Sequence, residues 1–218
     1  MDMKTVLITG ASSGIGLAIA LRLLNEGYHV VATSRSLEKL HSSFEREILN
    51  NLNVKLLKMD VSDSKDIELT FQRLAIDGIA IDALVNNAGY GFTGLLQTIS
   101  SDELLEQFQT NVFGLMEVTR NVLPYMKQQS AGKIINIGSV LGRFSAPWNG
   151  AYSASKFALE GLSESLRYEM HGSGVFVSIV EPGLFDTNFR DNQIESGSLV
   201  NEGLSWQNNH LKTVRRRG

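Results

Sequence analysis

A tyrosine and a lysine lie four residues apart in the segment YSASK, at Tyr152 and Lys156. Phe157, Leu162 and Leu166 recur at helical spacing around them, so we expect a helix here. Four residues make just over one helical turn, which places the phenol and the ammonium on the same face. A cation beside a phenol favours the phenolate, so the pairing predicts a lowered pKa for Tyr152 and a role as general acid and base. Taken alone, such a pair is more often two surface side chains that share a helix face by chance.

A glycine-rich segment, TGASSGIG at residues 9–16, lies between the first predicted strand and the first predicted helix. Glycines let the backbone turn sharply and approach a pyrophosphate, and the N-terminus of a helix offers free N–H groups to an anion. A tight structural turn is the alternative, but a dinucleotide site requires glycines at this place between strand and helix. The residues predicted to contact the cofactor are Gly10, Ser12, Ser13, Gly14, Ile15 and Gly16.

The end of the second predicted strand indicates which dinucleotide binds. An Asp or Glu at this place would accept hydrogen bonds from the ribose hydroxyls of NAD and repel the 2′-phosphate of NADP. The chain has Ser34 and Arg35 instead, a hydroxyl and a guanidinium that suit a phosphate. We therefore expect NADP rather than NAD. In the alternative interpretation, Arg35 is a surface side chain in a loop.

Composition narrows the class of protein. The 218 residues are 43% hydrophobic and 20% charged, which is typical of one globular domain with a substantial core. A net charge of −3 gives no indication of a nucleic-acid partner or an acidic membrane. No cysteine is present, so disulfides and cysteine-based metal sites are excluded, and no metal is expected. The first residues lack the layout of a signal peptide and no apolar run approaches about 18 residues, so we expect a cytoplasmic protein with no membrane partner.

Apolar runs alternate with helical stretches along the chain. Fully apolar strands that alternate with helices predict an α/β fold with a single doubly wound parallel sheet (Rossmann fold) and helices on both faces. From Asn188 onward the sequence is polar and no strand is predicted. The predicted strands are Thr5–Thr9, His29–Ser34, Val54–Met59, Ala83–Val85, Ile134–Ile137 and Val175–Val180. The predicted helices are Ile15–Glu26, Leu37–Leu49, Lys65–Ile76, Asp102–Met126 and the helix of the Tyr/Lys pair.

With these residues assembled, the chain resembles the short-chain dehydrogenase/reductase family over residues 3–190. The glycine-rich segment matches the family's TGxxxGIG, and Tyr152 and Lys156 match its YxxxK. Each motif alone is modest evidence, but their order, with a motif at the end of each strand, makes the resemblance specific. The other matches are Asp60-Val61, the NNAG at residues 86–89, Asn111, Ser139, and Pro182-Gly183 followed by Thr187.

The resemblance implies hydride transfer between the nicotinamide of NADP and a carbonyl or secondary alcohol carbon. Tyr152 would exchange the proton, Lys156 would hold the nicotinamide ribose, and Ser139 would hydrogen-bond the substrate oxygen. Asn111 would connect the lysine to solvent through a water molecule. The resemblance also assigns cofactor contacts to Asp60, Val61, Asn87, Ala88, Gly89, Tyr152, Lys156, Pro182, Gly183, Phe185 and Thr187.

Apolar side chains near these motifs indicate the kind of substrate. Such a lining suits a hydrophobic small molecule, and the segment from Ser139 to Thr187 resembles family members that act on steroids or retinoids. An alternative of equal weight is that these side chains only pack the loops. Arg143 is predicted to be solvated, with an acidic substrate group as the alternative, and no histidine falls on a motif. The expected pocket residues are Ser139, Phe92, Leu141, Phe144 and Trp148, with Tyr90, Phe185 and Phe189 nearby.

After Thr187 the chain departs from the family, whose members continue into a substrate-covering segment and a seventh strand. We expect an NADP-binding catalytic domain over residues 1–190 and a polar tail over residues 191–218 that is truncated or folds atypically. The sixth strand then becomes an exposed edge. The resemblance implies a homodimer through paired helices, or a homotetramer. The competing function is a dinucleotide-binding module or redox sensor without turnover, against which the complete set of proton-handling residues argues.

Overall fold

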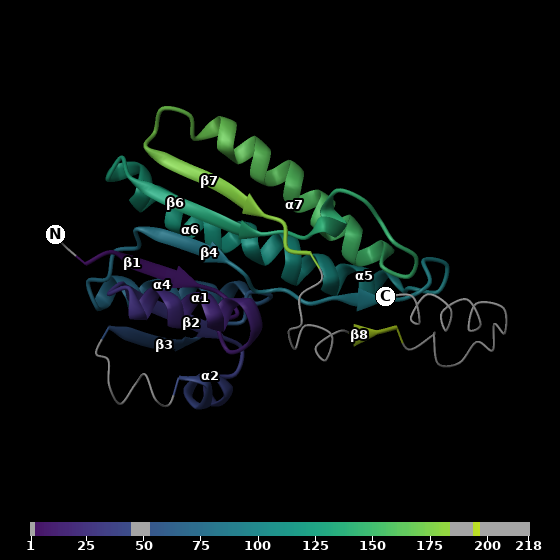
Figure 1. Cartoon of the computed structure of the whole chain (residues 1–218), viewed down its shortest axis with the longest axis horizontal. Coiled ribbons are helices and arrows are strands. Elements are labelled where there is room, and N and C mark those ends of the chain that lie inside the picture. Colours follow the sequence, from purple (N-terminus) through teal and green to yellow (C-terminus); the bar gives the residue numbers. More distant parts are fainter. Residues whose placement is uncertain (1–2, 45–52, 184–193, 197–218) are drawn as a thin grey trace.

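Six parallel strands form the central sheet of the computed structural model, which describes residues 3–44, 53–183 and 194–196. Their bounds are β1 (Thr5–Ile8), β2 (His29–Ser34), β3 (Val54–Lys58), β4 (Ala83–Asn86), β6 (Gly132–Ile137) and β7 (Val175–Val180). The strands lie in the order β3-β2-β1-β4-β6-β7, and all their pairings are parallel (Figure 1). The predicted doubly wound sheet is therefore confirmed, and its winding reverses between β1 and β4.

Helices cover both faces of this sheet (Figure 1). Their bounds are α1 (Gly14–Asn25), α2 (Leu37–Ser43), α4 (Ser64–Ile76), α5 (Ser101–Phe108), the π-helix η1 (Gln109–Gly114), α6 (Leu115–Gln128), the 3₁₀-helix η2 (Val140–Gly142) and α7 (Gly150–Glu169). Helices α1 and α2 pack on the face that carries Val6 and Ile8. Helices α4, α6 and α7 pack on the face that carries Leu7 and Val31. Because neighbouring residues of a strand face opposite sides, both must be apolar, which explains the continuous hydrophobic runs.

Four polar side chains are buried between the centre of the sheet and two of its helices. The amide of Asn86, at the end of β4, donates to Asn136 Oδ1 on β6 and to Thr119 Oγ1 on α6, each at 2.9 Å. Asn136 in turn donates to Ser163 Oγ on α7 at 2.8 Å. Buried polar groups are retained in a core when they are hydrogen-bonded. This chain of amides and hydroxyls therefore joins two strands to two helices.

The predicted helix at Asp102–Met126 consists of three segments, α5, η1 and α6. Helix α5 begins with a capping box, in which the side chains of Ser100 and Glu103 each accept from the other's backbone N–H. The π-helix that follows carries Asn111; such insertions are frequent at functional sites. It packs closely on the loop after β3, since a Cβ at Gly114 would lie 1.9 Å from the carbonyl oxygen of Val61. A π insertion leaves no trace in hydrophobic periodicity, so the sequence predicted one uninterrupted helix.

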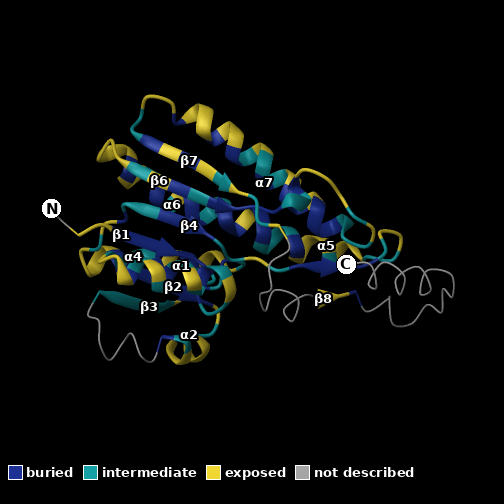
Figure 2. Ribbon diagram, viewed as in Figure 1, coloured by how far each residue is buried: buried dark blue, intermediate teal, exposed yellow. Residues whose placement is uncertain are grey.

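Strand β7 is the last strand of the main sheet in the part of the chain that the structure describes. Val175 and Val177 pack toward α7, while Phe176 and Val180 on the opposite face are 69% and 47% exposed (Figure 2). This exposure concerns the face of the strand, so the expectation that its edge is exposed stays a prediction. The predicted division at residue 190 stays a prediction, because residues 184–193 and 197–218 lie outside the described residues.

A second sheet of two short strands lies beyond the main sheet (Figure 1). β5 (Phe92–Thr93) pairs in parallel with β8 (Ile194–Glu195), and Ile194 N donates to Gly91 O at 2.9 Å. The prediction that no strand follows Asn188 is wrong here, because two paired residues are too short to leave a sequence pattern. Helix α2 ends at Ser43 with Phe44 as its C-cap, so the predicted helix is too long at this residue, and residues 45–49 of its predicted range lie outside the described residues. Among the described helices, none combines the length and apolar character needed to span a bilayer.

Candidate active site

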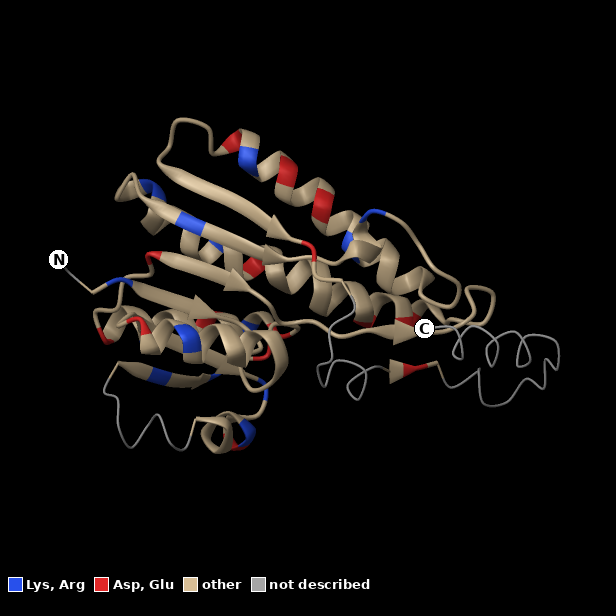
Figure 3. Ribbon diagram, in the orientation of Figure 1, with Lys and Arg blue, Asp and Glu red and all other residues tan. Residues whose placement is uncertain are grey.

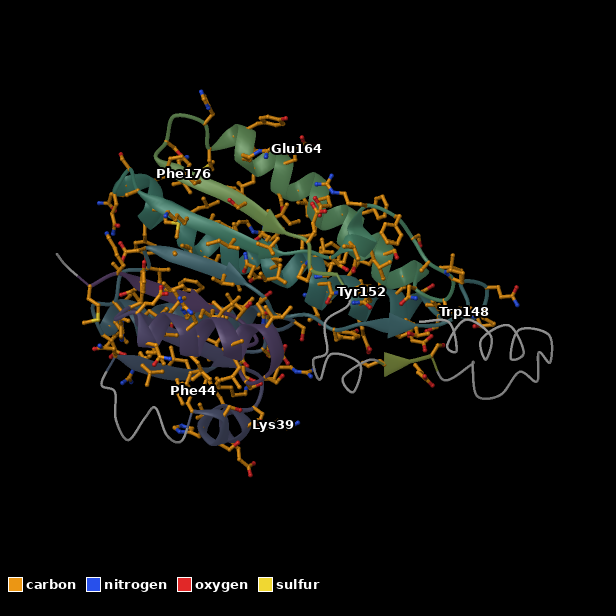
Figure 4. The ribbon with its side chains drawn as sticks, viewed as in Figure 1. Lys39, Phe44, Trp148, Tyr152, Glu164 and Phe176 are labelled. Atoms are coloured by element: carbon orange, nitrogen blue, oxygen red, sulfur yellow. The ribbon has the colours of Figure 1, made fainter. Side chains whose placement is uncertain are left out.

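The C-terminal ends of the six strands lie along one edge of the sheet, where the arrowheads in Figure 1 point. In doubly wound sheets, ligands bind outside this edge, near the point where the strand order reverses. Parallel strands therefore bring together the six loops that carry the motifs of the sequence analysis. Tyr152, labelled in Figure 4, lies beyond the same edge, near the start of α7.

The loop after β1 is shaped to receive an anion. Gly10 (φ +65°) and Gly14 (φ +55°) have left-handed backbone conformations that other residues rarely adopt. A Cβ at Gly16 would lie 2.4 Å from the side-chain nitrogen of Asn87, so only glycine fits there. Ser13 is the N-cap of α1, whose first turn, starting Gly14–Ile15, has neither a side-chain cap nor an acidic residue. The N–H groups and the positive dipole end of α1 are thus available to a phosphate.

Thr9 and Asn87 hold this loop in place. The hydroxyl oxygen of Thr9 accepts from the backbone N–H groups of Asn87 (3.0 Å) and Ala88 (2.9 Å). In return, the amide of Asn87 donates to the carbonyl oxygens of Thr9 (2.9 Å) and Gly10 (3.0 Å). The side chain of Asn87, a predicted cofactor contact, is therefore engaged with the glycine turn, and Gly89 lies exposed two residues further on. Sequence reasoning missed Thr9; its place directly before the first glycine was the available signal.

The residues predicted to choose between NADP and NAD lie at the end of β2. Ser34 donates to Ser12 Oγ at 3.1 Å, and Ser43 donates to the carbonyl oxygen of Ser12 at 2.7 Å. These bonds tie the glycine turn to β2 and α2. Arg35 is exposed and forms no ion pair with any residue in the described ranges, so its guanidinium is available to a ligand. Among the described residues, the end of β2 and Arg35 after it include no carboxylate.

Asp60 and Val61 follow β3. Asp60 Oδ1 accepts from the backbone N–H (2.9 Å) and the hydroxyl (2.6 Å) of Ser62. These two bonds fix the orientation of the carboxylate, while its second oxygen has no hydrogen bond among the described residues. Val61 is buried, with its carbonyl oxygen against η1. The loop after β3 is therefore held rigidly beside the π-helix.

Ser139, Tyr152 and Lys156 come together at the ends of β6 and α7. The side chain of Ser139 accepts from Leu141 N at 3.1 Å and is also hydrogen-bonded to Tyr152. The ammonium of Lys156 donates to the carbonyl oxygen of Ile137 at 2.8 Å and lies 5.7 Å from the centroid of the Tyr152 ring. All three catalytic candidates are buried. The serine hydroxyl, the phenol and the ammonium thus share one enclosed environment.

Burial controls the protonation of this group. It raises the pKa of Tyr152, and the hydrogen bond with Ser139 lowers that pKa only in part. The pKa of Tyr152 is therefore raised in the chain itself, contrary to the predicted lowering, because desolvation outweighs the hydrogen bond with Ser139 and Lys156 is not among the causes of the shift. Burial also lowers the pKa of Lys156 to about 8, while the carboxylate of Glu160 acts to raise it.

Asn111 is buried in η1 and bonded to two neighbours. Its amide nitrogen donates to the carbonyl oxygen of Tyr90 (3.1 Å) and to Ser155 Oγ (3.2 Å), and its Oδ1 accepts from Tyr90 N (3.2 Å). Gln107 donates to the same carbonyl oxygen at 3.2 Å. The structure thus places Asn111 between the segment after NNAG and the catalytic helix. Its predicted role in a water relay stays a prediction.

The predicted substrate-lining residues differ in their surroundings. Phe92 is buried in β5, Leu141 is half-buried in η2, and Phe144 is 57% exposed. Trp148, labelled in Figure 4, is half-buried with a strained φ of +64°, and its carbonyl oxygen accepts from Gly94 N at 2.9 Å.

The remaining predicted residues follow β7 or lie away from the site. The carbonyl oxygen of Pro182 accepts from Val140 N at 3.1 Å, which joins the PG segment to η2, and Gly183 is exposed. His41 and His171 are exposed and His29 lies beside Thr5. The predictions for Phe185, Thr187, Phe189 and His210 fall outside the described residues.

The side chain of Arg143 is 61% exposed, so the interpretation of it as a solvated side chain is confirmed, although it is not isolated. It forms ion pairs with Glu181 (2.7 Å) and Glu160 (3.1 Å), one at the end of β7 and one on α7.

Comparison with known sequences agrees with this geometry. The short chain dehydrogenase family matches residues 4–197. The 3-ketodihydrosphingosine reductase of Bacteroides thetaiotaomicron is 37% identical over 215 residues, which cover 99% of this chain and 76% of that protein. Retinol dehydrogenase 8 of Bos taurus is 38% identical over 203 residues, which cover 90% of this chain and 64% of that protein. The predicted similarity to retinol dehydrogenase-like members is confirmed.

Solved structures share the same fold. A short-chain dehydrogenase from Streptomyces avermitilis has a TM-score of 0.83 at 37% identity, with 89% of this chain and 71% of that chain covered. A variant of actinorhodin polyketide ketoreductase, solved with NADPH, has a TM-score of 0.81 at 32% identity, with 85% and 72% covered. Together with the parallel sheet and the strand-end motifs, these matches show that the chain belongs to the short-chain dehydrogenase/reductase family of oxidoreductases.

Proposed function

We propose that the chain transfers a hydride between NADP(H) and a carbonyl or secondary alcohol carbon of a hydrophobic substrate. The observation that carries the proposal is the enclosed group of Ser139, Tyr152 and Lys156 at the edge of the sheet where ligands bind. A module that only binds a dinucleotide needs no such proton-handling group. The competing function as a sensor without turnover is therefore less well supported.

The loops after the first three strands fit a dinucleotide with a 2′-phosphate. The uncapped N-terminus of α1 suits the pyrophosphate, and the close approach at Gly16 leaves space for backbone only. Arg35 and Ser34 suit the 2′-phosphate, where a carboxylate would repel it. The free oxygen of Asp60 suits a donor group of the adenine. These features support NADP over NAD.

The residues of the chain then manage the proton. When bound, the nicotinamide supplies or accepts the hydride. During reduction the phenol of Tyr152 donates its proton to the substrate oxygen, and during oxidation it takes that proton back. Ser139, whose oxygen is held by Leu141 N, orients the same substrate oxygen. The charge of Lys156 stabilises the phenolate that remains on Tyr152 after the proton has left.

Two observations support a hydrophobic substrate, one from the exposure of apolar side chains and one from the relatives. Leu141, Phe144 and Trp148 lie in the segment that joins Ser139 to the catalytic helix, and all three retain some exposure to solvent. Relatives named for ketodihydrosphingosine and for retinol support the same class of substrate.

We further propose that two copies associate through the catalytic helix and its neighbours. Leu105, Phe113 and Phe157 are large exposed hydrophobic residues on α5, η1 and α7, and these three elements contact one another. Sedimentation equilibrium should show a dimer, and Phe157→Glu should shift it toward the monomer. A tetramer would point to a second interface. The cytoplasmic location stays a prediction from composition.

Consumption of NADPH in the presence of hydrophobic ketones and aldehydes tests the proposed reaction. Tyr152→Phe should lower kcat by at least about 100-fold, which is the usual contribution of a general acid, and should leave NADPH affinity nearly unchanged. Tyr125→Phe, at an exposed tyrosine on α6, is the matched control. Undiminished turnover in Tyr152→Phe contradicts the assignment of the acid. Tight NADPH binding without turnover across the whole panel favours the sensor.

The choice of cofactor is tested with Arg35→Ser. Loss of a charge-assisted contact with the 2′-phosphate should raise the KM for NADPH about tenfold while leaving the KM for NADH unchanged. Arg22→Ser, at an exposed arginine on α1, should leave both values unchanged. Equal changes for NADPH and NADH in Arg35→Ser would show that this side chain does not contact the 2′-phosphate.

A further inference from the structure

Three charged side chains form a cluster behind Ser139, and none of them has a role in the mechanism above. Arg143 donates to Glu181 Oε1 from Nε (2.9 Å) and Nη2 (2.7 Å), and its Nη2 also lies 3.1 Å from Glu160 Oε2. The arginine follows η2, and the two carboxylates belong to α7 and to the end of β7. Figure 3 shows the acidic residues along α7 and a basic segment in the loop beside it. One guanidinium therefore joins the three elements that surround the serine.

Glu160 is the member of this cluster that lies on the catalytic helix α7. It follows Lys156 by one turn of α7, and its side chain is only 12% exposed. Its Oε1 is buried and has no hydrogen bond to any residue in the described part of the chain. Cβ atoms built on Gly138 and Gly142 would lie 3.2 and 3.3 Å from this oxygen. The carboxylate therefore packs against the backbone on both sides of Ser139.

The charge of Glu160 acts on the catalytic lysine. Burial raises the pKa of Glu160, as do Glu181 and Glu164, while Arg143 and Lys156 lower it. In turn, Glu160 raises the pKa of Lys156, which burial lowers to about 8. Glu160 is the one charged group that shifts the pKa of this lysine among the described residues; Glu181 is not among the causes. A carboxylate beside a buried ammonium favours its charged form.

An incidental surface ion pair is the plain alternative, because exposed pairs contribute little to stability. Arg143 is indeed well exposed, but it holds two carboxylates at once, and one of them, that of Glu160, has a buried oxygen that packs against the backbone around Ser139. A buried carboxylate without its full set of hydrogen bonds is costly to retain. That cost indicates a role beyond the pairing itself.

We propose that Glu160, held in place by Arg143 and Glu181, is a positioning residue that fixes the Ser139 loop against α7 and holds its carboxylate one helical turn from Lys156. The proposal rests on the function proposed above for Ser139 and Lys156. The proposal has two parts, the placement of the loop and the charge of the lysine, and the two carboxylates differ in the parts that they serve. Glu160 serves both the placement of the loop and the charge of the lysine, whereas Glu181 serves only the placement.

Three isosteric variants separate these parts: Glu160→Gln, Glu181→Gln and, as a matched control at the exposed end of α7, Glu169→Gln. The readouts are kcat for NADPH-dependent reduction and the titration of Lys156, followed through the ¹³Cε resonance assigned with Lys156→Arg. Glu160→Gln should lower kcat about tenfold, as a small misplacement of a substrate-orienting group does, and should titrate Lys156 at a lower pH. Glu181→Gln should lower kcat without moving that titration. The control should change neither.

The outcomes distinguish this proposal from the proposed function. If wild type turns over and Glu160→Gln behaves like Glu169→Gln in both readouts, the positioning role is wrong. If wild type does not turn over, the proposed function fails, and the Lys156 titration alone decides the electrostatic part. If Glu160→Gln does not fold, Arg143→Gln removes the ion pairs with Glu160 and Glu181 from the exposed side. A lowered kcat in that variant supports the proposal, and an unchanged kcat overturns it.

Discussion

Replacing Thr9 by valine removes one hydroxyl from the junction between the glycine turn and the NNAG segment. Valine has nearly the shape of threonine, so the packing of this buried side chain is retained. The loss is the acceptor for two backbone N–H groups, those of Asn87 at 3.0 Å and Ala88 at 2.9 Å. Both groups then have to find water or stay unbonded.

The size of the effect follows from how far these groups are buried. A buried donor left without a partner costs about 1–3 kcal/mol. Asn87 and Ala88 are half-buried, so we take the lower part of that range, about 1–2 kcal/mol for each and about 2–4 kcal/mol together. Such a loss is a large part of the free energy of unfolding of a typical domain.

Urea unfolding without nucleotide measures this loss as a lower midpoint at an unchanged m-value. Thr33→Val is the matched control, because Thr33 is a buried threonine on the neighbouring strand β2 whose hydroxyl, within the described residues, makes a single hydrogen bond, to Ile8 O at 3.3 Å. That variant should lose about 1 kcal/mol or less. Equal losses in the two variants, or no loss in Thr9→Val, would refute the reasoning.

Three further predictions follow from the surroundings of single side chains. In the folded chain the pKa of Lys156 is about 8, below its ordinary 10.5. Below pH 8 the charged lysine therefore lowers the free energy of unfolding by about 3 kcal/mol, and this loss of stability disappears as the pH rises through 10.5. Lys156→Met should therefore have a higher free energy of unfolding than wild type, by a larger difference at pH 7 than at pH 9.5. A difference in urea unfolding that is the same at both pH values would contradict this. Gly16→Ala should bind NADPH at least tenfold more weakly by fluorescence titration, since its Cβ would meet Asn87; unchanged affinity would show that the turn can yield. Gly161→Ala, exposed within α7 with nothing within 4 Å of the new Cβ, should stabilise the fold by about 0.5–1 kcal/mol in the same unfolding assay, and a loss would mean that this position needs a glycine backbone.

The sheet and the location of the site could be predicted because their signals are local. A run such as Val175–Val180 is recognisable by itself as a strand, and parallel strands must end at one edge. The motif at each strand end then follows from its place in the chain. The residues Ser139 and Tyr152 could be placed at one site in this way, with no knowledge of side-chain contacts.

The rest depended on contacts between distant residues. The sequence cannot tell an isolated Arg143 from one that two carboxylates hold, because Glu160 and Glu181 are separate in the chain. The pKa of Tyr152 was predicted from a neighbour four residues away, whereas burial by the whole fold decides its direction. The π-helix around Asn111 is likewise fixed by the loop that packs against Gly114.

The buried amides of Asn86 and Asn136 also affect how β4 and β6 align when the sheet forms. The two residues are direct partners in the native pairing. If the pairing of β4 with β6 shifts by one residue, each side chain of the shifted strand moves to the opposite face, which hydrophobic burial disfavours. A shift by two residues keeps each apolar side chain on its original face. A shift by two would place Asn86 opposite Ile134 or Gly138 and leave buried amides unpaired, at about 1–3 kcal/mol each. The amide pair therefore selects one alignment among those that the apolar residues alone would accept equally.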